Sequence, residues 1–438
     1  MRKFLVMMAV GLCAAFGAQA APREFFSGYI GTVPPNKEDQ AKTYFDRPEV
    51  RRLLAALENG GILETAAANM LAGSETQLAD LERLHLVRDD KGMVRLGFPY
   101  FTANDIALIH AVADKYVPTL IAAYKTREAD LDTILARYPV ASVDRKRLAF
   151  VVLAGFSLNW DALDFLAERK YRQPILIQGP GWQYGFWASE DVPGYSYKGC
   201  YWGSSSFPAD NYNLSPPLDF TFSSLGDPDS DPRMSFPDLL AMPEQDMSPP
   251  IRAAAEKLGL HDDNSMGLGL KNVVGLDRAR SFGAILFAMR AGVQTRDNIC
   301  AMLPAEEAPD CDGELGLLAA AGYAKVSADE HWALLVPVLD TSDKPMLDAA
   351  LALSRRVIAD WLAQNYAPIH HELFRLTAVR QGVPYPALFS QIWHELFGLA
   401  TRDLVAEGII EDPRGPDAVW QGSVPALWRT ADFHHDWQ

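Results

Sequence analysis

Histidine and glutamate residues gather at two places in the last third of the chain, where they suggest metal-dependent chemistry. His370, His371 and Glu372 are consecutive, and His394 is followed by Glu395. A zinc-hydrolase helix carries a second histidine four residues after the first, with glutamate directly behind the first. HHELFRL has no histidine at that place. We therefore interpret the histidines as helix-surface residues and the glutamates as capping acids, with a metal site as the alternative.

A run of aspartates further upstream has the alternation of a calcium-binding loop. DPDSDPRMSFPD places Asp227, Asp229 and Asp231 at alternate positions and Asp238 twelfth. Calcium needs several convergent oxygen ligands, which these carboxylates can supply. The sixth position of a helix-loop-helix calcium site requires glycine, whereas here it is Pro232. An irregular calcium site and a solvated acidic turn both stay open, and the sequence suggests no other cofactor.

Motifs that activate a nucleophile or bind a nucleotide are missing from the sequence. It contains no GxSxG, no CxxC, no phosphate-binding loop and no dinucleotide fingerprint. Carboxylate-based hydrolases need only two acids that the fold brings together, and Glu190 with Asp191 lies in an aromatic segment. A hydrolase acting on a wall or polymer substrate is therefore the alternative to a non-enzymatic protein.

The N-terminus predicts an exported protein. A cationic start and an apolar run from Phe4 to Phe16 precede the small-residue end AQA, as in a secretory leader, residues 1–20, cut after Ala20. The alternative, a membrane anchor, is not favoured because the run is shorter than the roughly 20 residues that span a bilayer. The mature chain is expected in the periplasm or outside the cell, without a membrane span.

Three cysteines remain once the leader is removed. Cys300 and Cys311 bracket a short loop, so in an oxidising compartment they are predicted to form a disulfide. Cys200 is then the odd cysteine. We interpret it as a small buried apolar residue rather than a reactive thiol, because Lys198 is the only basic residue nearby that could lower its pKa.

Charge argues against nucleic acid as a partner. The chain has 40 Lys and Arg against 56 Asp and Glu, a net charge of −16 at pH 7. Without a run of cations, so acidic a protein repels phosphate backbones. The apolar fraction of 49% is enough to fill folded cores, so the chain is predicted to be ordered.

Two distant stretches share an order of residues. DFLAERKYRQPILIQGPGWQ, residues 164–183, and DLVAEGIIEDPRGPDAVWQ, residues 403–421, have D..AE.....P, GP and WQ in common. At an offset of 239 residues the register holds without a gap from Thr102 to Pro174. We interpret the chain as one unit used twice, at 24–195 and 253–430, with an irregular aromatic and Pro-rich insert at 196–252 and a tail at 431–438.

A shorter sequence pattern recurs inside each unit. LADLERLHLVRDDKGMVRLGFP, LGLLAAAGYAKVSADEHWALLVP and RDLVAEGIIEDPRGPDAVWQGSVP each read as helix, strand, tight turn and strand. This pattern resembles the winged-helix modules of bacterial transcriptional regulators. Each unit is then winged helix, long helix and winged helix, with long helices at Asn104 to Lys125 and Ser342 to Asn365 opened by a threonine cap. The predicted fold class is mainly α with short β-wings.

Aromatic residues crowd the end of the first unit and the start of the insert. The sequence-based candidates for ligand contact there are Trp182, Tyr184, Trp187, Tyr197 and Trp202. Trp182 has a counterpart in Trp420, which indicates a structural role, whereas Trp187 and Trp202 have none. These rings can cover a junction between units or form a binding surface.

The favoured function is that of an exported, non-enzymatic binding or scaffold protein. Its aromatic insert would contact a protein, peptide or glycan. The winged-helix resemblance implies DNA binding, but export and the acidic balance disfavour it.

Overall fold

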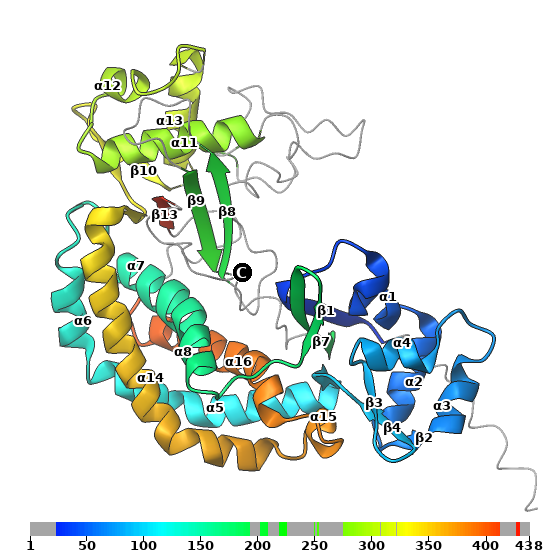
Figure 1. Cartoon of the computed structure of the whole chain (residues 1–438). Coiled ribbons are helices and arrows are strands. Elements are labelled where there is room, and N and C mark those ends of the chain that lie inside the picture. Colours follow the sequence, from blue (N-terminus) through cyan, green and yellow to red (C-terminus); the bar gives the residue numbers. More distant parts are fainter. Residues whose placement is uncertain are drawn as a thin grey trace, which may run out of the picture.

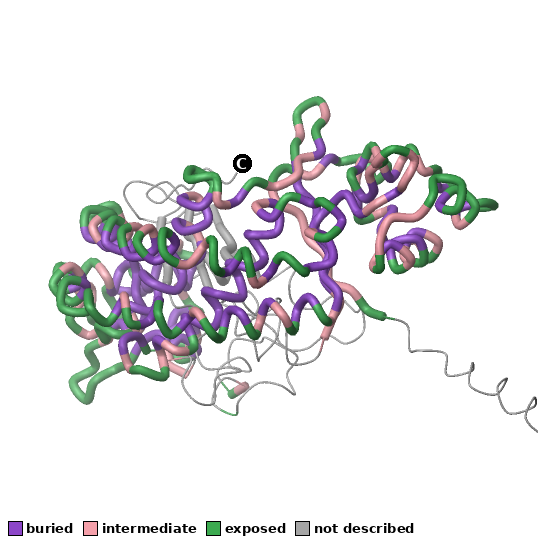
Figure 2. Tube along the Cα trace, turned by 90° about the horizontal axis from the view of Figure 1, so that it is seen from below, coloured by how far each residue is buried: buried purple, intermediate pink, exposed green. Residues whose placement is uncertain are grey.

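The chain folds mainly into helices, with small sheets between them, as its periodicity predicts. A computed structural model describes residues 23–192, 202–208, 219–225, 249, 252–253, 275–306, 308–320, 322–411 and 426–429. The long helices form a central body, and two smaller modules lie at opposite ends of it (Figure 1). Buried residues concentrate along the long helices, whereas exposed residues predominate in the outer loops of the N-terminal module (Figure 2).

The N-terminal module combines short helices with a three-stranded sheet. Its helices are α1 (Ala41–Phe45), α2 (Pro48–Leu57), α3 (Glu64–Leu71) and α4 (Leu78–Arg83), after a 3-10 turn at Lys37–Asp39. Its strands are β2 (Ile62–Leu63), β3 (Val87–Asp89) and β4 (Met93–Leu96), in the order β2-β4-β3. Apolar residues of α2 recur every three or four positions and are buried: Val50, Leu53, Leu54 and Leu57. Lys91 and Gly92 both have positive φ, as a tight hairpin turn requires.

A second sheet joins the module to the helical body. Its central strand β7 (Trp182–Glu190) pairs antiparallel with β1 (Phe25–Thr32) on one side. On its other side β7 pairs antiparallel with β6 (Leu176–Gly179) and parallel with β5 (Tyr100–Phe101). Pro180 and the positive-φ Gly181 form the two-residue turn between β6 and β7, which accounts for Gly179-Pro180 in the first copy of the repeated pattern.

The helical body interleaves the two halves of the chain. The first half contributes α5 (Ala103–Lys125), α6 (Glu128–Leu135), α7 (Arg145–Phe150), the π-helix η2 (Val151–Asp161) and α8 (Ala162–Glu168). The second half contributes α14 (Lys344–Leu373), α15 (Thr377–Arg380) and α16 (Tyr385–Ala406). Helices α5 and η2 of the first half both pack against α14 and α16 of the second half. Each half therefore buries its apolar faces mainly against the other.

Two helices are long and apolar enough to cross a membrane by length and composition alone. They are Ala103–Lys125 and the continuous segment Arg145–Glu168, within the part of the chain that the structure describes. In the 18-residue stretch of Arg145–Glu168 that is apolar enough to span a membrane, 89% of the residues are buried inside the protein. Core packing accounts for that apolar character, so no membrane span is firmly indicated.

The remaining elements belong to the second half. Strands β8 (Trp202–Pro208) and β9 (Asp219–Leu225) form a hairpin. They are followed by α11 (Gly275–Arg290), α12 (Arg296–Cys300), a 3-10 turn at Ala308–Asp310, α13 (Cys311–Ala320), and the hairpin of β10 (Ala324–Val326) and β11 (Trp332–Leu334). A four-stranded sheet has the order β12-β13-β9-β8, with β12 at Val338–Leu339 and β13 at Ala426–Arg429. Two strands thus lie in the segment 196–252, which sequence analysis describes as irregular.

Element order and strand register occur twice. Tyr100 of β5 lies opposite Ala188 of β7 in a parallel pair, and Val338 of β12 lies opposite Leu427 of β13 in another. The offsets are 238 residues for the first strand of each pair and 239 for the second, close to the offset of 239 residues that the sequence shows between Thr102 and Pro174. Both outer partners, β1 and β9, pair antiparallel with their central strands.

A reciprocal cap opens the first long helix, and another opens the 3-10 turn that leads into the second. The hydroxyl of Thr102 accepts a hydrogen bond from the Asp105 amide, and the Asp105 carboxylate accepts from the Thr102 amide. In the second half the cap is Asp340, paired with Asp343, and Thr341 lies inside a 3-10 turn at Thr341–Asp343. The predicted threonine cap is thus found at α5 and is wrong for the second helix, where a carboxylate satisfies the amides more strongly.

The predicted disulfide between Cys300 and Cys311 is confirmed, with a Cα–Cα distance of 5.7 Å. It joins the end of α12 to the start of α13, and both cysteines are buried. We expect Cys300→Ser together with Cys311→Ser to lower the free energy of unfolding by about 2 to 3 kcal/mol, because the unfolded chain loses a closed loop. Urea unfolding monitored by circular dichroism checks this, and an unchanged midpoint with an unchanged slope would contradict it.

A histidine couples α5 to α16 and predicts a pH dependence. Nδ1 of His110 lies 2.5 Å from Oε1 of Glu395, and this carboxylate raises the pKa of His110 despite partial burial. Asp114 raises it further and Arg402 opposes the rise. The stabilisation is fully present below about pH 6.5, the pKa of an unfolded histidine, and is lost as pH rises through the elevated folded pKa. The free energy of unfolding from urea titrations of the wild type should be lower at pH 9 than at pH 6. His110→Gln should make this difference smaller.

Candidate binding cavity

Tyr184, a predicted ligand contact, is part of the module core. Its side chain has no exposed surface. Its hydroxyl donates to the carbonyl oxygen of Asp39 (2.6 Å) and accepts from the Ala41 amide (2.9 Å). Burial raises the pKa of Tyr184 to about 12, so the phenol stays a donor. The predicted contact is therefore corrected to a structural role, because a ring at 0% exposure offers no surface to a ligand.

Trp182 is half-buried beside the β6–β7 turn. A β-carbon on Gly179 would lie 2.1 Å from Trp182 Cζ2, so the glycine makes room for the indole. The ring lines an open groove of about 790 Å³, together with Asp39 and Arg83, which form an ion pair at 2.9 Å. Its position at a turn fits the structural role indicated by its counterpart Trp420.

Trp187 faces the other side of the same sheet. Its side chain is 4% exposed and meets the ring of Phe26 edge-on, with centroids 5.4 Å apart. A β-carbon on the opposite residue, Gly28, would lie 2.9 Å from Trp187 Cζ2, so this glycine also makes room for an indole. Trp187 lines a cavity between the sheet and the helical body, and we take that cavity as the candidate site.

Other sequence-based candidates fall outside the described residues. They are Tyr197, Asp227, Asp229, Asp231 and Asp238, together with Cys200. Trp202 begins β8, of which only the backbone is described.

The candidate cavity has a volume of about 360 Å³ and three walls. Strand β1 forms one wall, with Phe26 and Ile30 on the face that Trp187 shares. The π-helix and α8 form the second wall through Asn159, Trp160 and Leu163. Helix α16 forms the third through Ser390, Gln391 and His394, and Arg172, which follows α8, also lines the cavity. The volume is near the lower end of the range for ligand pockets, roughly 300 to 1,000 Å³.

Buried polar groups converge on this cavity. Asn159, Arg172, Ser390, Gln391 and His394 are each between 2% and 8% exposed. Arg172 Nη1 donates to the carbonyl oxygen of Leu163 at 3.3 Å, while its Nε and the Oε1 of Gln391 have no hydrogen-bond partner among the described residues. Nδ1 of His394 donates to the carbonyl oxygen of Ser390 at 2.6 Å. Burial lowers the pKa of Arg172, which the charge of Asp164 partly opposes. Arg172 and Gln391 thus bring hydrogen-bonding capacity to the cavity wall that their described neighbours leave unused.

The polar residues that α16 adds to the lining have no polar counterpart in the first half of the chain. At the repeat offset of 239 residues, Gln391 and His394 correspond to Val152 and Gly155, which are also buried. A helix of this type therefore packs in this fold without these polar groups. Because burying them is unfavourable, their presence in one copy needs a reason other than folding.

The wall that carries Asn159 is a π-helix of 11 residues. Such helices are rare and occur frequently at functional sites, because the wider turn displaces side chains from their α-helical positions. Sequence analysis missed Asn159, Arg172 and Gln391 as site residues. The available signal was polar residues interrupting apolar runs, at Asn159 in VVLAGFSLNW and at Gln391 in ALFSQIW.

The histidine cluster of the sequence is divided by the fold. His370 and His371 are exposed in the last turn of α14, where surface positions are predicted. His394 and Glu395 are buried in α16, so the surface interpretation is wrong for them, because α16 is covered on nearly every side. Glu372 bonds to Lys115 and Tyr116 (2.6 and 2.7 Å). Across the described ranges no three histidine, cysteine or acidic side chains are placed to hold a metal.

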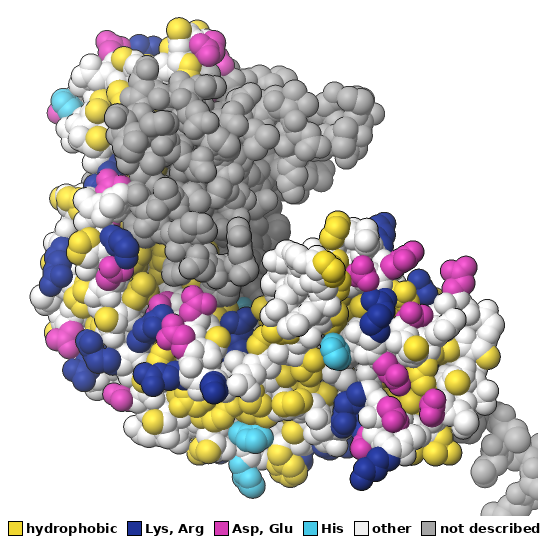
Figure 3. Space-filling model, in the orientation of Figure 1, with side chains coloured by type: hydrophobic (Ala, Val, Ile, Leu, Met, Phe, Trp, Pro, Cys, Tyr) yellow, Lys and Arg dark blue, Asp and Glu magenta, His cyan; other side chains and the backbone are white. Residues whose placement is uncertain are grey.

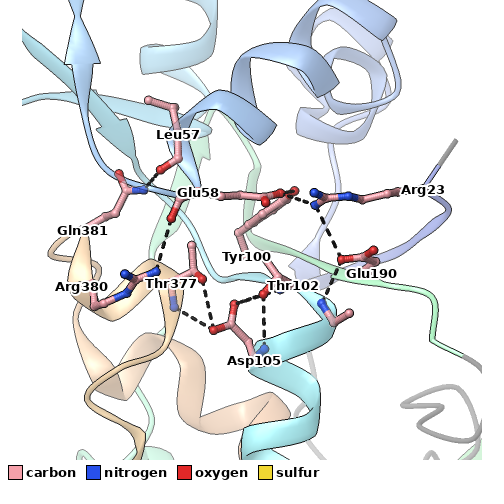
Figure 4. A network of polar contacts seen from close by, with 11 residues as sticks. Arg23, Leu57, Glu58, Tyr100, Thr102, Asp105, Glu190, Thr377, Arg380 and Gln381 are labelled. Carbon is pink, nitrogen blue, oxygen red and sulfur yellow. Dashed lines mark hydrogen bonds and ion pairs between the residues drawn. The ribbon is translucent and has the colours of Figure 1, made fainter. Parts of the chain in front are cut away.

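Glu190, one acid of the alternative hydrolase, is engaged in the junction between module and body. Its Oε2 accepts from the Ala103 amide at 2.9 Å, at the start of α5, and lies 3.7 Å from Arg23 (Figure 4). Arg23 also contacts Glu58, whose carboxylate accepts from the hydroxyl of Tyr100 at 2.8 Å. These contacts hold Glu190 in a structural network rather than in the cavity.

Among the strands that the structure describes, β1 has an edge without a partner, and this edge lies beside the cavity. The amide of Asp191 bonds to the carbonyl oxygen of Glu24, so even-numbered residues of β1 exchange hydrogen bonds with β7. The N–H and C=O groups of Ser27, Tyr29 and Gly31 then point away from β7, and no described strand pairs with them. An antiparallel or parallel segment can therefore add to this edge.

Comparison of the chain with family models, with curated proteins and with solved structures finds no match.

Proposed function

We propose that the protein is an exported, non-enzymatic binding protein whose partner is a peptide. The peptide lies in extended form along the free edge of β1 and places one residue in the candidate cavity. The observation that carries this proposal is the cavity itself, where aromatic walls and unpartnered buried polar atoms lie next to unpaired strand backbone. Strand addition supplies affinity through backbone hydrogen bonds, and a pocket for a side chain supplies specificity.

A peptide explains more of the site than a glycan or a hydrolase substrate does. Backbone N–H and C=O groups at Ser27 and Tyr29 match the alternation of a peptide strand, not that of a sugar chain. Glu190 is held by Ala103 and Arg23, which leaves no paired carboxylates in the cavity among the residues described.

The scaffold in this proposal consists of two tandem winged-helix units. Its support is the order of α2, β2, α3, α4 and the β3–β4 hairpin, in which β4 lies between β2 and β3. Further support is the helix and hairpin of α13, β10 and β11 before the second long helix. In this arrangement the modules position the long helices, and the cavity forms where the two halves meet.

We expect no micromolar binding to duplex DNA at physiological salt. The helix that would enter the major groove, α4, has Arg83 as its one cation, and Arg83 is paired with Asp39. On the face shown in Figure 3, Lys and Arg side chains are mixed with Asp and Glu over the module. Fluorescence anisotropy with a labelled duplex at two salt concentrations checks this. Salt-dependent micromolar affinity would show that the charge argument fails.

The peptide proposal is tested by selecting a random peptide library against the purified mature protein and measuring Kd for the enriched peptides. Ser27→Pro removes the outward N–H at the edge without removing a β1–β7 hydrogen bond, and Ser27→Ala is its matched control. The proline variant should bind about tenfold more weakly, and the alanine variant like the wild type.

A second measurement does not depend on the proline variant folding. Enriched peptides that are N-methylated at alternate residues should lose binding to the wild type in one register and keep it in the other. Failure to enrich any peptide, binding of glycans instead, or equal affinity of both methylated series would each overturn the proposal.

A further inference from the structure

We propose that the candidate cavity contains a carboxylate subsite, in which Arg172 binds an acidic group of the peptide and Gln391 accepts a neighbouring peptide N–H. This inference rests on the proposed peptide-binding function and narrows its ligand. It follows from the charges and hydrogen bonds at the end of the cavity where Arg172 lies.

Arg172 is a buried cation that forms no ion pair with a described carboxylate, although the charge of Asp164 acts on it. The residue is 8% exposed, and its guanidinium makes its one hydrogen bond to described residues, at 3.3 Å, with a neutral carbonyl oxygen. It forms no ion pair within 4.0 Å with any described carboxylate. A buried charge is strongly unfavourable unless it is paired, and a guanidinium matches a carboxylate with two parallel hydrogen bonds. An anionic ligand group would therefore complete this end of the cavity.

Asp164 acts on Arg172 through its charge but forms no ion pair with it among the contacts of the described residues. Burial raises the pKa of Asp164, and the charge of Arg172 lowers it in part. Burial lowers the pKa of Arg172, and the charge of Asp164 raises that pKa by a smaller amount. The carbonyl oxygen of Leu163 orients the guanidinium from the α8 side, so the group is positioned in the cavity wall before a ligand arrives.

Gln391 also lines the cavity, and its buried Oε1 has no donor among described residues. A ligand that presents a carboxylate together with an N–H satisfies both residues. The last residue of a peptide has both groups, as does an internal aspartate with its own amide. Phe26, Trp160 and Trp187 surround the same space, so an apolar side chain is expected next to the acid.

The test compares fluorescein-labelled peptides from the selection, each made with a free C-terminal carboxylate, with a C-terminal amide, and with internal Asp replaced by Asn. Kd is measured by fluorescence polarisation on the mature protein. One of the two uncharged forms should bind at least about tenfold more weakly than the parent, since a charge-assisted bond is lost. Which form loses affinity identifies the source of the carboxylate.

Arg172→Met should abolish that difference, so that acid and uncharged peptides bind equally. Arg169→Met is the matched control, because Arg169 is exposed three residues earlier and does not line the cavity. Arg172→Lys keeps the charge and should retain part of the preference, which guards against misfolding of the methionine variant. If peptides bind but all three forms have equal Kd, this inference fails while the peptide proposal stands. If no peptide binds the wild type, the peptide proposal fails first.

Discussion

Trp393→Ala is expected to lower the free energy of unfolding by about 3 to 5 kcal/mol. Trp393 is fully buried and among the largest side chains of the core. Its Nε1 donates to the carbonyl oxygen of Leu158 in the π-helix at 2.7 Å. Its ring also meets Trp361 of α14 edge-on, with centroids 6.3 Å apart. Truncation therefore opens a cavity between three helices and leaves a π-helical carbonyl without its donor.

Urea unfolding monitored at 222 nm measures this effect. Trp393→Phe separates the two contributions, since it keeps most of the volume and removes only the N–H, and it should be milder than the alanine change. Phe374→Ala is the control, because this aromatic residue is 53% exposed and surface changes usually shift stability by less than about 1 kcal/mol. Equal midpoints for Trp393→Ala and Phe374→Ala would contradict the assigned role of Trp393.

Helix positions are the part of the fold that the sequence predicts best. The first long helix is predicted at Asn104 to Lys125 and begins one residue earlier, at Ala103. The second is predicted to end at Asn365 but continues to Leu373, past Pro368. Its last turns keep burying Ile369 and Leu373 against the core, and this packing outweighs the loss of one backbone hydrogen bond at proline.

The π-helix could not be predicted from periodicity. Of the 11 residues from Val151 to Asp161, ten are buried, so no polar face distinguishes 3.6 residues per turn from a wider spacing. The contacts that distinguish η2 are tertiary: Trp393 donates to the carbonyl oxygen of Leu158, and α14 packs against η2.

Part of the candidate site can be predicted from the sequence. Trp187 was identified because the second unit has no counterpart for it, and the structure places it in the cavity wall. Arg172 and Gln391 were missed because they come from segments more than 200 residues apart, and no local pattern pairs them. Comparing the two repeats position by position marks Gln391 opposite Val152, which is a signal that the sequence already contains.

Asp105 joins the two halves of the chain at the start of α5, and its removal should be nearly as damaging as that of Trp393. The residue is 4% exposed. One carboxylate oxygen accepts from the amide and hydroxyl of Thr102, both at 2.9 Å. The other accepts from the amide and hydroxyl of Thr377, at 2.9 and 3.2 Å, at the start of α15 (Figure 4). A single buried side chain therefore satisfies donors from both halves.

Asp105→Ala should lower the free energy of unfolding by about 2 to 5 kcal/mol, since each buried donor left without an acceptor costs about 1 to 3 kcal/mol. The matched control is Asp114→Ala on the same helix, whose side chain is 65% exposed and lies 3.7 Å from Arg402, where an ion pair contributes about 0 to 1 kcal/mol. Hydrogen exchange adds a local readout, because the Thr377 amide should lose protection in Asp105→Ala and keep it in Asp114→Ala. An alanine variant within about 0.5 kcal/mol of the wild type, with the Thr377 amide still protected, would show that other contacts hold the two halves together.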